Sequence, residues 1–281
     1  MKKYRHSIPT ILRWTIGCAG IALTSCSFHT RLVQQKMEEQ TGIDPEAFDR
    51  NLHIAEELAG DDRIAWMSTD SILAERISLL DSLDSTWFVC KADNRSYAYY
   101  GRYVPEEEVY YPKYVFVSTS DSTIEKVPPD TGATATFFAR MVAAGNNYFK
   151  RIVDSLQLDI HYNHYIRKAP GGRCIMWFFP AGYANYCAQG IEIRLTIDSA
   201  SGEVSGYDVD GTLLRYFELD KKNKPVELDN RWSDIPSIGN IFFVLRNRDN
   251  FPDMKIINRS SISRLVYSPE NEEWTWKHRP R

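Results

Sequence analysis

Hydrophobic and polar residues alternate without interruption over residues 191–198, and this is the clearest strand pattern in the chain. Four aliphatic side chains share one face of the segment, and charged or hydroxyl-bearing side chains share the other. A period of two is typical of a strand with one buried face and one face in water. Upstream, residues 173–179 form an almost unbroken apolar run, so we expect a central strand that is covered on both faces.

Turn-forming residues separate this strand from the segments that follow it. Residues 199–202 are Ser, Ala, Ser and Gly, and residues 203–209 then predict a second strand. Asp210 and Gly211 suit a tight hairpin turn, because such turns need positive φ and both residues tolerate it. We therefore expect residues 212–219 to return alongside the second strand.

Residues 130–157 carry the clearest helical pattern, because their apolar side chains fall within one broad arc and polar side chains fill the opposite one. A helix with so strong an apolar side must pack on a flat hydrophobic surface, and the strands that follow it are the nearest such surface. The pattern therefore predicts an α+β fold, in which a mostly antiparallel sheet is packed by one long amphipathic helix.

A small helical layer is predicted before the sheet, over residues 44–84. Asp44 and Pro45 suit the start of a first helix, and Gly60 suits its end. A second helix is predicted over residues 69–83, where aliphatic side chains recur at helical spacing.

Shorter strand patterns follow this layer. Residues 86–90 and 96–103 predict a hairpin that turns at Asp93 and Asn94, and residues 114–118 predict a further strand.

The C-terminal part of the chain has strand patterns over residues 263–267 and 273–276. Residues 237–247 fit two descriptions, a helix that begins near Ser237 or a strand over residues 241–245. The sequence leaves both open.

The N-terminus has the pattern of an export signal. The first 25 residues contain four Lys or Arg residues and no Asp or Glu, and residues 14–23 are mainly apolar. That stretch has the length of a signal-peptide core and is shorter than the roughly 20 residues that span a bilayer. We therefore expect residues 1–25 to be a signal peptide and the protein to be exported.

Residues 23–26, Leu-Thr-Ser-Cys, resemble the lipobox of bacterial lipoproteins. The resemblance implies that Cys26 receives a diacylglycerol, becomes the new N-terminus and is acylated again, as in palmitate-bearing lipoproteins. Several acyl chains on one residue give lasting membrane attachment. Ser27, in place of Asp, resembles an outer-membrane address. In overall texture the chain is similar to uncharacterised cell-envelope lipoproteins of Gram-negative bacteria.

Removal of the signal makes the chain more acidic. Without its four basic residues the protein keeps 30 Lys and Arg against 37 Asp and Glu, a formal charge of −7. We expect no nucleic-acid partner, because nucleic-acid binding depends on basic clusters that meet phosphates. A mature length of about 255 residues suits one large domain. Residues 26–43 are expected to be a lipid-anchored tether, and residues 44–281 a single α+β domain.

Three cysteines, Cys90, Cys174 and Cys187, remain after the signal peptide, which contains Cys18, is removed and Cys26 is lipidated. If residues 179–182 formed a two-residue hairpin turn, Cys174 and Cys187 would face each other, and the oxidising periplasm would allow a disulfide. A longer loop over residues 181–190 would instead separate the two thiols. The sequence leaves both arrangements open.

Seven tyrosines lie between residues 97 and 114, beside a run of three glutamates. Tyr97, Tyr99, Tyr110 and Tyr111 are candidates for a binding surface, because exposed aromatic rings stack on sugars and anchor protein partners. The alternative is that these tyrosines serve strands, where Tyr is favoured, and that the glutamates lie in a solvated loop.

A metal site is not expected at the two neighbouring histidines, His161 and His164. They lie three residues apart in a predicted strand, so their side chains point to opposite faces and do not easily share an ion. We expect no cofactor.

Residues 208–212, Asp-Val-Asp-Gly-Thr, resemble the first motif of the haloacid dehalogenase phosphatases. The resemblance implies that Asp208 is the phosphoryl-accepting nucleophile, that Asp210 is the acid/base and that Mg²⁺ lies between them. In that family the motif ends a buried parallel strand, whereas residues 204–207 are Val, Ser, Gly and Tyr. A turn after an antiparallel strand is therefore the leading interpretation, and the phosphatase is the alternative.

These patterns favour binding over catalysis. We expect a membrane-anchored envelope lipoprotein that acts as a non-enzymatic binding or assembly component for a protein or glycan partner. Attachment to a membrane raises the local concentration of a protein near its membrane partners, so modest affinity suffices.

Overall fold

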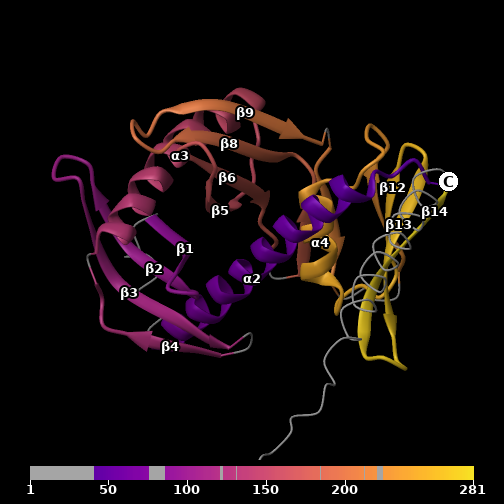
Figure 1. The fold of residues 1–281 in the computed structure, drawn as a ribbon, viewed down its shortest axis with the longest axis horizontal. Coiled ribbons are helices and arrows are strands. Elements are labelled where there is room, and N and C mark those ends of the chain that lie inside the picture. The colour runs from indigo at the N-terminus through magenta and orange to yellow at the C-terminus, as the bar shows by residue number, and fades with distance from the viewer. Residues whose placement is uncertain are drawn as a thin grey trace, which may run out of the picture.

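The computed structural model describes residues 41–75, 86–120, 123–130, 132–183, 185–211, 213–219 and 224–281. Within these ranges the protein has an α+β fold with three helices and 14 strands. Figure 1 shows two four-stranded sheets that curve around one helix, α3, and a further sheet at the C-terminal end of the molecule. A second long helix, α2, runs diagonally between these two parts.

The first sheet is an antiparallel meander. It consists of β1 (Thr86–Ala92), β2 (Arg95–Val104), β3 (Val109–Ser120) and β4 (Thr123–Val127). The predicted hairpin between the first two strands is confirmed. Asp93 and Asn94 form its turn with φ of 50° and 60°, a conformation that Asp and Asn adopt more readily than most residues.

The second sheet is also antiparallel. Its order is β5 (Tyr162–Ala169), β6 (Arg173–Pro180), β8 (Glu192–Asp198) and β9 (Val204–Asp210). The strands predicted over residues 173–179, 191–198 and 203–209 are confirmed, and β6 has the predicted central position. Alternate residues of β8 are fully buried, so its buried and open faces follow the sequence pattern.

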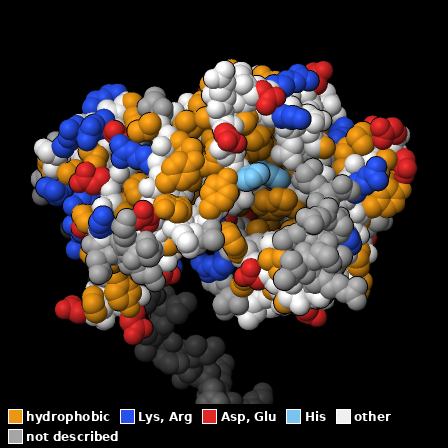
Figure 2. All heavy atoms as spheres, turned by 180° about the vertical axis from the view of Figure 1, so that it is seen from behind, with side chains coloured by type: hydrophobic (Ala, Val, Ile, Leu, Met, Phe, Trp, Pro, Cys, Tyr) orange, Lys and Arg blue, Asp and Glu red, His pale blue; other side chains and the backbone are white. Residues whose placement is uncertain are grey.

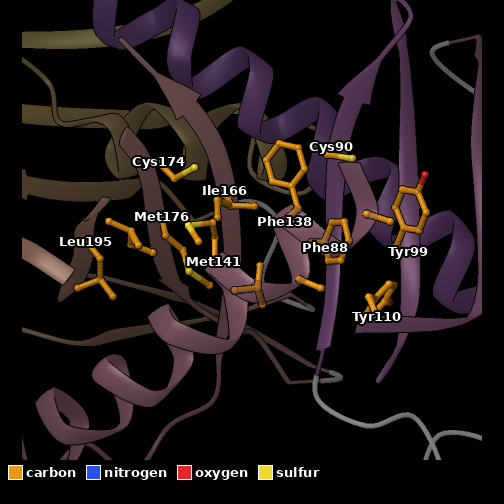
Figure 3. Close-up of a cluster of buried hydrophobic side chains, with 14 of the residues drawn as sticks. Phe88, Cys90, Tyr99, Tyr110, Phe138, Met141, Ile166, Cys174, Met176 and Leu195 are labelled. Carbon is orange, nitrogen blue, oxygen red and sulfur yellow. The ribbon is translucent and has the colours of Figure 1, made fainter. Parts of the chain in front are cut away.

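Helix α3 (Ala133–Leu156) lies between the two sheets and packs against both. Figure 3 shows Phe138 and Met141 of this helix between Phe88 of the first sheet and Met176 of the second. The segment predicted as an amphipathic helix is therefore helical and packs on the strands that follow it. The expectation of one long helix on one sheet is not confirmed, because α2 is a second long helix and the strands form several sheets.

The two sheets meet where β1 and β5 lie side by side. His164 Nε2 on β5 is 2.7 Å from the main-chain oxygen of Trp87 on β1, and the two rings are in contact. Burial lowers the pKa of His164 to about 4, so its imidazole is neutral at physiological pH. The sheets thus form one curved wall around α3.

Helix α2 (Pro45–Glu75) replaces the two short helices predicted at the N-terminal side. Its start is as predicted, since Asp44 Oδ1 accepts hydrogen bonds from the main-chain N–H groups of Glu46 and Ala47. The predicted end at Gly60 is wrong, because the helix continues through it. Burial of residues on both sides of Gly60 outweighs a penalty of about 1 kcal/mol for a helical glycine. Residues 76–83 of the second predicted helix lie outside the described ranges.

The hairpin predicted at Asp210 and Gly211 is also wrong. The chain leaves the sheet at Gly211, where φ is +83°, and β10 (Arg215–Glu218) pairs with β7 (Tyr186–Gln189) in a separate two-stranded ribbon. The outer strand β9 is mostly exposed and offers little to bury. Phe217 instead packs against the rings of Phe243 and Phe251, so burial determines where β10 lies.

The C-terminal sheet mixes parallel and antiparallel pairs. Its strands are β11 (Val226–Asn230), β12 (Met254–Asn258), β13 (Ser261–Ser268) and β14 (Glu273–Pro280). The first two are parallel because the chain between them contains helix α4 (Ile238–Asn247). Ser237 caps this helix, accepting a 3.1 Å hydrogen bond from the N–H of Asn240. Residues 237–247, left open by the sequence, are therefore helical, and the predicted strands at 263–267 and 273–276 are confirmed.

Candidate functional site

The four tyrosines proposed as a binding surface do not share one. Tyr99 and Tyr110 are buried in the core around α3, as Figure 3 shows, and Tyr97 is partly buried against the same core. Tyr111 is 48% exposed, and its hydroxyl donates a hydrogen bond to Glu107. The pairing of β2 with β3 turns most of these rings inward, so the alternative that they serve the strands describes them better.

The disulfide proposed between Cys174 and Cys187 is not formed, and both thiols are free. Cys174 lies on β6, which is hydrogen-bonded to β5 and β8 on its two sides, so β7 cannot pair beside it. Cys187 lies on β7, with its Sγ 2.8 Å from Asn247 Oδ1. Burial raises the pKa of both thiols. The two thiols are therefore separated, as the longer-loop alternative expects, although residues 186–189 of that segment form β7. The proposed lipidation site, Cys26, lies outside the described ranges.

Asp208 and Asp210 lie on β9, the exposed edge strand of an antiparallel sheet. Asp208 forms a 2.7 Å ion pair with Arg194 on the neighbouring strand, and Asp210 accepts a 2.9 Å hydrogen bond from the indole N–H of Trp232. The buried parallel strand required by the phosphatase motif is not present at this position. Among the described residues, no group of three or more His, Cys, Asp or Glu side chains is arranged to hold a metal ion.

Glu192 lies opposite Asp210 across the β8–β9 pair. Its carboxylate accepts a 3.1 Å hydrogen bond from the N–H of Gly239 in the first turn of α4. Burial, and then the neighbouring Asp210, raise the pKa of Glu192 to about 8. The carboxyl oxygen of Glu192 satisfies a main-chain N–H that has no partner within the helix, so we interpret Glu192 as a structural link between β8 and α4.

A larger cleft lies between α2, α4 and the segment that joins β6 to β7. It has a volume of about 540 Å³, which is within the range of roughly 300–1,000 Å³ that is typical of ligand pockets. Three separate parts of the chain line it, within residues 59–66, at residues 182, 183 and 186–188, and at residues 245–250, with Leu219 just after β10 beside them. We call this region the α2–α4 cleft.

A buried carboxylate fixes the inner wall of the α2–α4 cleft. Asp62 of α2 accepts a hydrogen bond from the hydroxyl of Tyr165 on β5, and its other oxygen is 3.0 Å from Nε of Arg246 on α4. Burial raises the pKa of Asp62, and the Arg246 guanidinium opposes this rise. Because Asp62 contacts both the second sheet and α4, it holds the walls of the cleft in register.

Aromatic side chains stand at the rim of the cleft. Trp66 is 49% exposed, Tyr183 is 54% exposed and Tyr186 is 40% exposed. The guanidinium of Arg246 lies 5.5 Å from the centre of the Trp66 ring. Large apolar side chains exposed together around a hollow mark a binding site more often than isolated ones do.

Hydrophobic side chains reach the surface elsewhere too. Figure 2 shows them gathered near the middle of one face of the molecule, around a hollow and a histidine. What distinguishes the α2–α4 cleft is that its exposed rings are combined with an ion pair between the buried Asp62 and the partly exposed Arg246.

The cleft was not predicted from the sequence. Its residues come from distant segments, and the expected helix end at Gly60 separated Asp62 and Trp66 from the first helix. One signal was available, since Asp61 and Asp62 are adjacent acids flanked by Leu58 and Ile64. Acidic residues among the buried positions of a helix require partners, and both have one: Arg167 Nη2 is 2.6 Å from Asp61 Oδ2.

Comparison with known proteins identifies no relative: no family model matches the chain, and no curated protein or solved structure matches it either. Within the described ranges, no helix has the length and apolar character needed to cross a membrane. The α2–α4 cleft and the N-terminal sequence are therefore the two features of this protein that indicate a function.

Proposed function

We propose that this protein is a lipid-anchored component of the bacterial cell envelope, at the outer membrane, and that it binds a glycan in the α2–α4 cleft without catalysis. The single observation that carries the proposal is the combination of three exposed aromatic rings with the fixed Asp62–Arg246 pair around one cleft. Trp66, Tyr183 and Tyr186 supply the rings.

Glycans suit such a cleft for two reasons. The C–H faces of sugar rings pack on aromatic side chains, and sugar hydroxyls require several donors and acceptors near those rings. Asn247 and Asn250 of the cleft wall can both donate and accept hydrogen bonds, and Arg248 supplies further donors. A protein partner usually needs a larger and flatter surface, so it is the less favoured occupant.

The anchor rests on the sequence. A basic start, an apolar stretch and the residues Leu-Thr-Ser before Cys26 support cleavage and lipidation there. Residues 26–43 then form a tether that allows the domain over residues 44–281 to extend away from the membrane. A binding protein held in this way meets envelope glycans at high local concentration.

A binding role is preferred to catalysis because of how the buried acids in the cleft and beside it are held. Asp62 is occupied by Arg246 and Tyr165, and Glu192 is held by Gly239. General acid–base catalysis instead requires carboxyl groups within reach of a bound substrate.

The test is binding of the full-length protein, in detergent micelles, to immobilised neutral and acidic polysaccharides. We expect Trp66→Ala and Tyr183→Ala each to weaken binding several-fold, because each removes a stacking surface. Trp232→Ala and Tyr207→Ala are matched controls, since these side chains are 41% and 52% exposed and lie outside the cleft.

Two results would contradict the proposal. One is equal weakening by the control variants, and the other is no binding to any polysaccharide by a protein with a normal melting temperature. Recovery of a single protein by crosslinking in intact cells, lost in Trp66→Ala, would replace the glycan with a protein partner.

A further inference from the structure

Arginines are prominent in the lining of the α2–α4 cleft, where Arg246 and Arg248 lie near the buried Asp62. A guanidinium group at the wall of a cleft attracts ligands that carry negative charge.

Arg246 is the arginine whose position is most tightly fixed. Its Nε is held by Asp62 at 3.0 Å, and its guanidinium stacks on Trp66. Arginine has five N–H donors, so this arrangement leaves four on the two Nη atoms. None of these four has a protein acceptor among the described residues, and the side chain is 21% exposed at the wall of the cleft.

The guanidinium group is planar, so when it is held through Nε its two Nη groups present parallel N–H donors, like the two prongs of a fork. Planar carboxylates match this fork with two parallel hydrogen bonds, and the interaction is among the stronger ones in proteins. The adjacent Trp66 ring offers a face for the sugar that carries the carboxylate.

We infer that the glycan bound in the α2–α4 cleft is an acidic one, whose sugar carboxylates are bound by the Arg246 guanidinium while the sugar ring packs on Trp66. This inference rests on the proposed function and adds the class of ligand. Arg246 is then the residue that determines specificity, and Asp62 is the residue that positions it.

The experiment compares two polymers that differ only in charge, polygalacturonate and its methyl ester, as ligands of the full-length protein. We expect tighter binding of the free acid. Arg246→Gln should weaken binding of the acid about tenfold and leave the ester nearly unchanged. Arg246→Lys should lose most of the preference although it keeps the charge, because a lysine has no fork. Arg194→Gln, an exposed arginine outside the cleft, is the control.

Arg246→Gln leaves Asp62 buried with one partner fewer, so this variant can unfold. The double variant Asp62→Asn/Arg246→Gln removes both charges together and keeps a polar pair in place. A folded double variant that retains the preference for the acid would overturn the inference.

The outcomes separate the inference from the proposed function. Equal binding of acid and ester, unaffected by Arg246→Gln, would overturn the inference and leave a neutral-glycan cleft. Displacement by glycerol phosphate but not by glucuronate would overturn the carboxylate assignment in favour of a phosphate. Binding of neither polymer, nor of any other polysaccharide, would mean that the proposed function itself is wrong.

Discussion

The hydroxyl of Tyr165 on β5 donates a hydrogen bond to the carboxylate of Asp62 on α2, although the two residues are 103 positions apart in the sequence. Both side chains are buried. Through Arg246 the same carboxylate reaches α4, so one acidic side chain connects α2, the second sheet and α4. This connection fixes the shape of the α2–α4 cleft. It lies inside the protein, where water cannot readily replace a hydrogen bond that is lost.

Tyr165→Phe tests this connection. The variant keeps the ring but removes the donor, which leaves a buried carboxylate oxygen without it, and we expect the free energy of unfolding to fall by about 1–3 kcal/mol. Denaturant titration of the protein in detergent measures the change. Tyr183→Phe, at an exposed ring, should change it by less than about 0.5 kcal/mol. A loss no larger than this control would show that the hydrogen bond contributes little.

Gly60→Ala tests why α2 does not end where the sequence suggests. The residue lies inside the helix, and a Cβ added there would meet no atom within 4 Å. An alanine therefore gains helix propensity without a clash, and we expect the free energy of unfolding to rise by about 0.5–1 kcal/mol.

The contrasting variant is Gly239→Ala, in the first turn of α4. Its Cβ would lie 1.9 Å from Cδ of Glu192, so the carboxylate must move and lose its hydrogen bond to this turn. We expect this variant to be destabilised. Destabilisation by Gly60→Ala as well would mean that the helix is strained or interrupted at residue 60.

The sequence predicts best those elements whose conformation is determined by residues that are close together in the chain. The alternation in β8 reports a surface that is buried on one side only, and α3 has one broad apolar arc because the two sheets form one curved wall around it. The turn at Asp93 and Asn94 needs only two residues that tolerate positive φ. These elements were predicted because each depends on neighbouring residues alone.

Helix α2 was divided in two because its apolar side changes along its length. Phe48 and Leu58 pack in the core with α4 and the C-terminal sheet, whereas Ile64 and Ile72 pack against the first sheet. A helix that packs against two different parts of the protein has no single apolar stripe along its length, so its hydrophobic periodicity is weak in the sequence.

The candidate site depends on contacts between distant segments. Trp66, Tyr183 and Arg246 become neighbours only after α2, the second sheet and α4 have packed. The burial of Phe217 with Phe243 likewise directs β10 to β7, a pairing that no local turn signal indicates. The sequence could therefore suggest a binding protein but not the position of its cleft.

Glu192 predicts a pH dependence of stability. Its ordinary pKa of 4.5 applies to the unfolded chain, and its pKa in the folded protein is about 8, so between these values the folded state binds the proton more tightly. The contribution of this group is thus fully present below about pH 4.5 and is lost as the pH rises to 8. We expect Glu192→Gln, which keeps an acceptor for the N–H of Gly239, to reduce the fall in the free energy of unfolding across this window.

The measurement is denaturant unfolding at pH 5, 6, 7 and 8. Asp61 also contributes a fall with rising pH, because burial raises its pKa to about 7 against the opposing effect of Arg167. The slope should therefore decrease in Glu192→Gln rather than vanish. Asp208→Asn, at an exposed position of the same sheet, should leave the slope in place. An unchanged slope in Glu192→Gln would mean that Glu192 is better solvated than its position suggests.

The anchor can be separated from the cleft with Cys26→Ala. If the lipobox is used, this variant keeps its signal peptide or is released, and in either case it loses the acyl chains that give lasting attachment. We expect the wild-type protein to fractionate with the outer membrane and to label with palmitate, and the variant to do neither.

Binding of the solubilised variant to acidic polysaccharide should be unchanged, because the cleft begins at residue 59. In intact cells, crosslinking to envelope glycan should fall in Cys26→Ala and in Trp66→Ala for different reasons, the first by loss of position and the second by loss of contact. Attachment to the outer membrane that persists in Cys26→Ala would mean that something other than acyl chains on Cys26 holds the protein there.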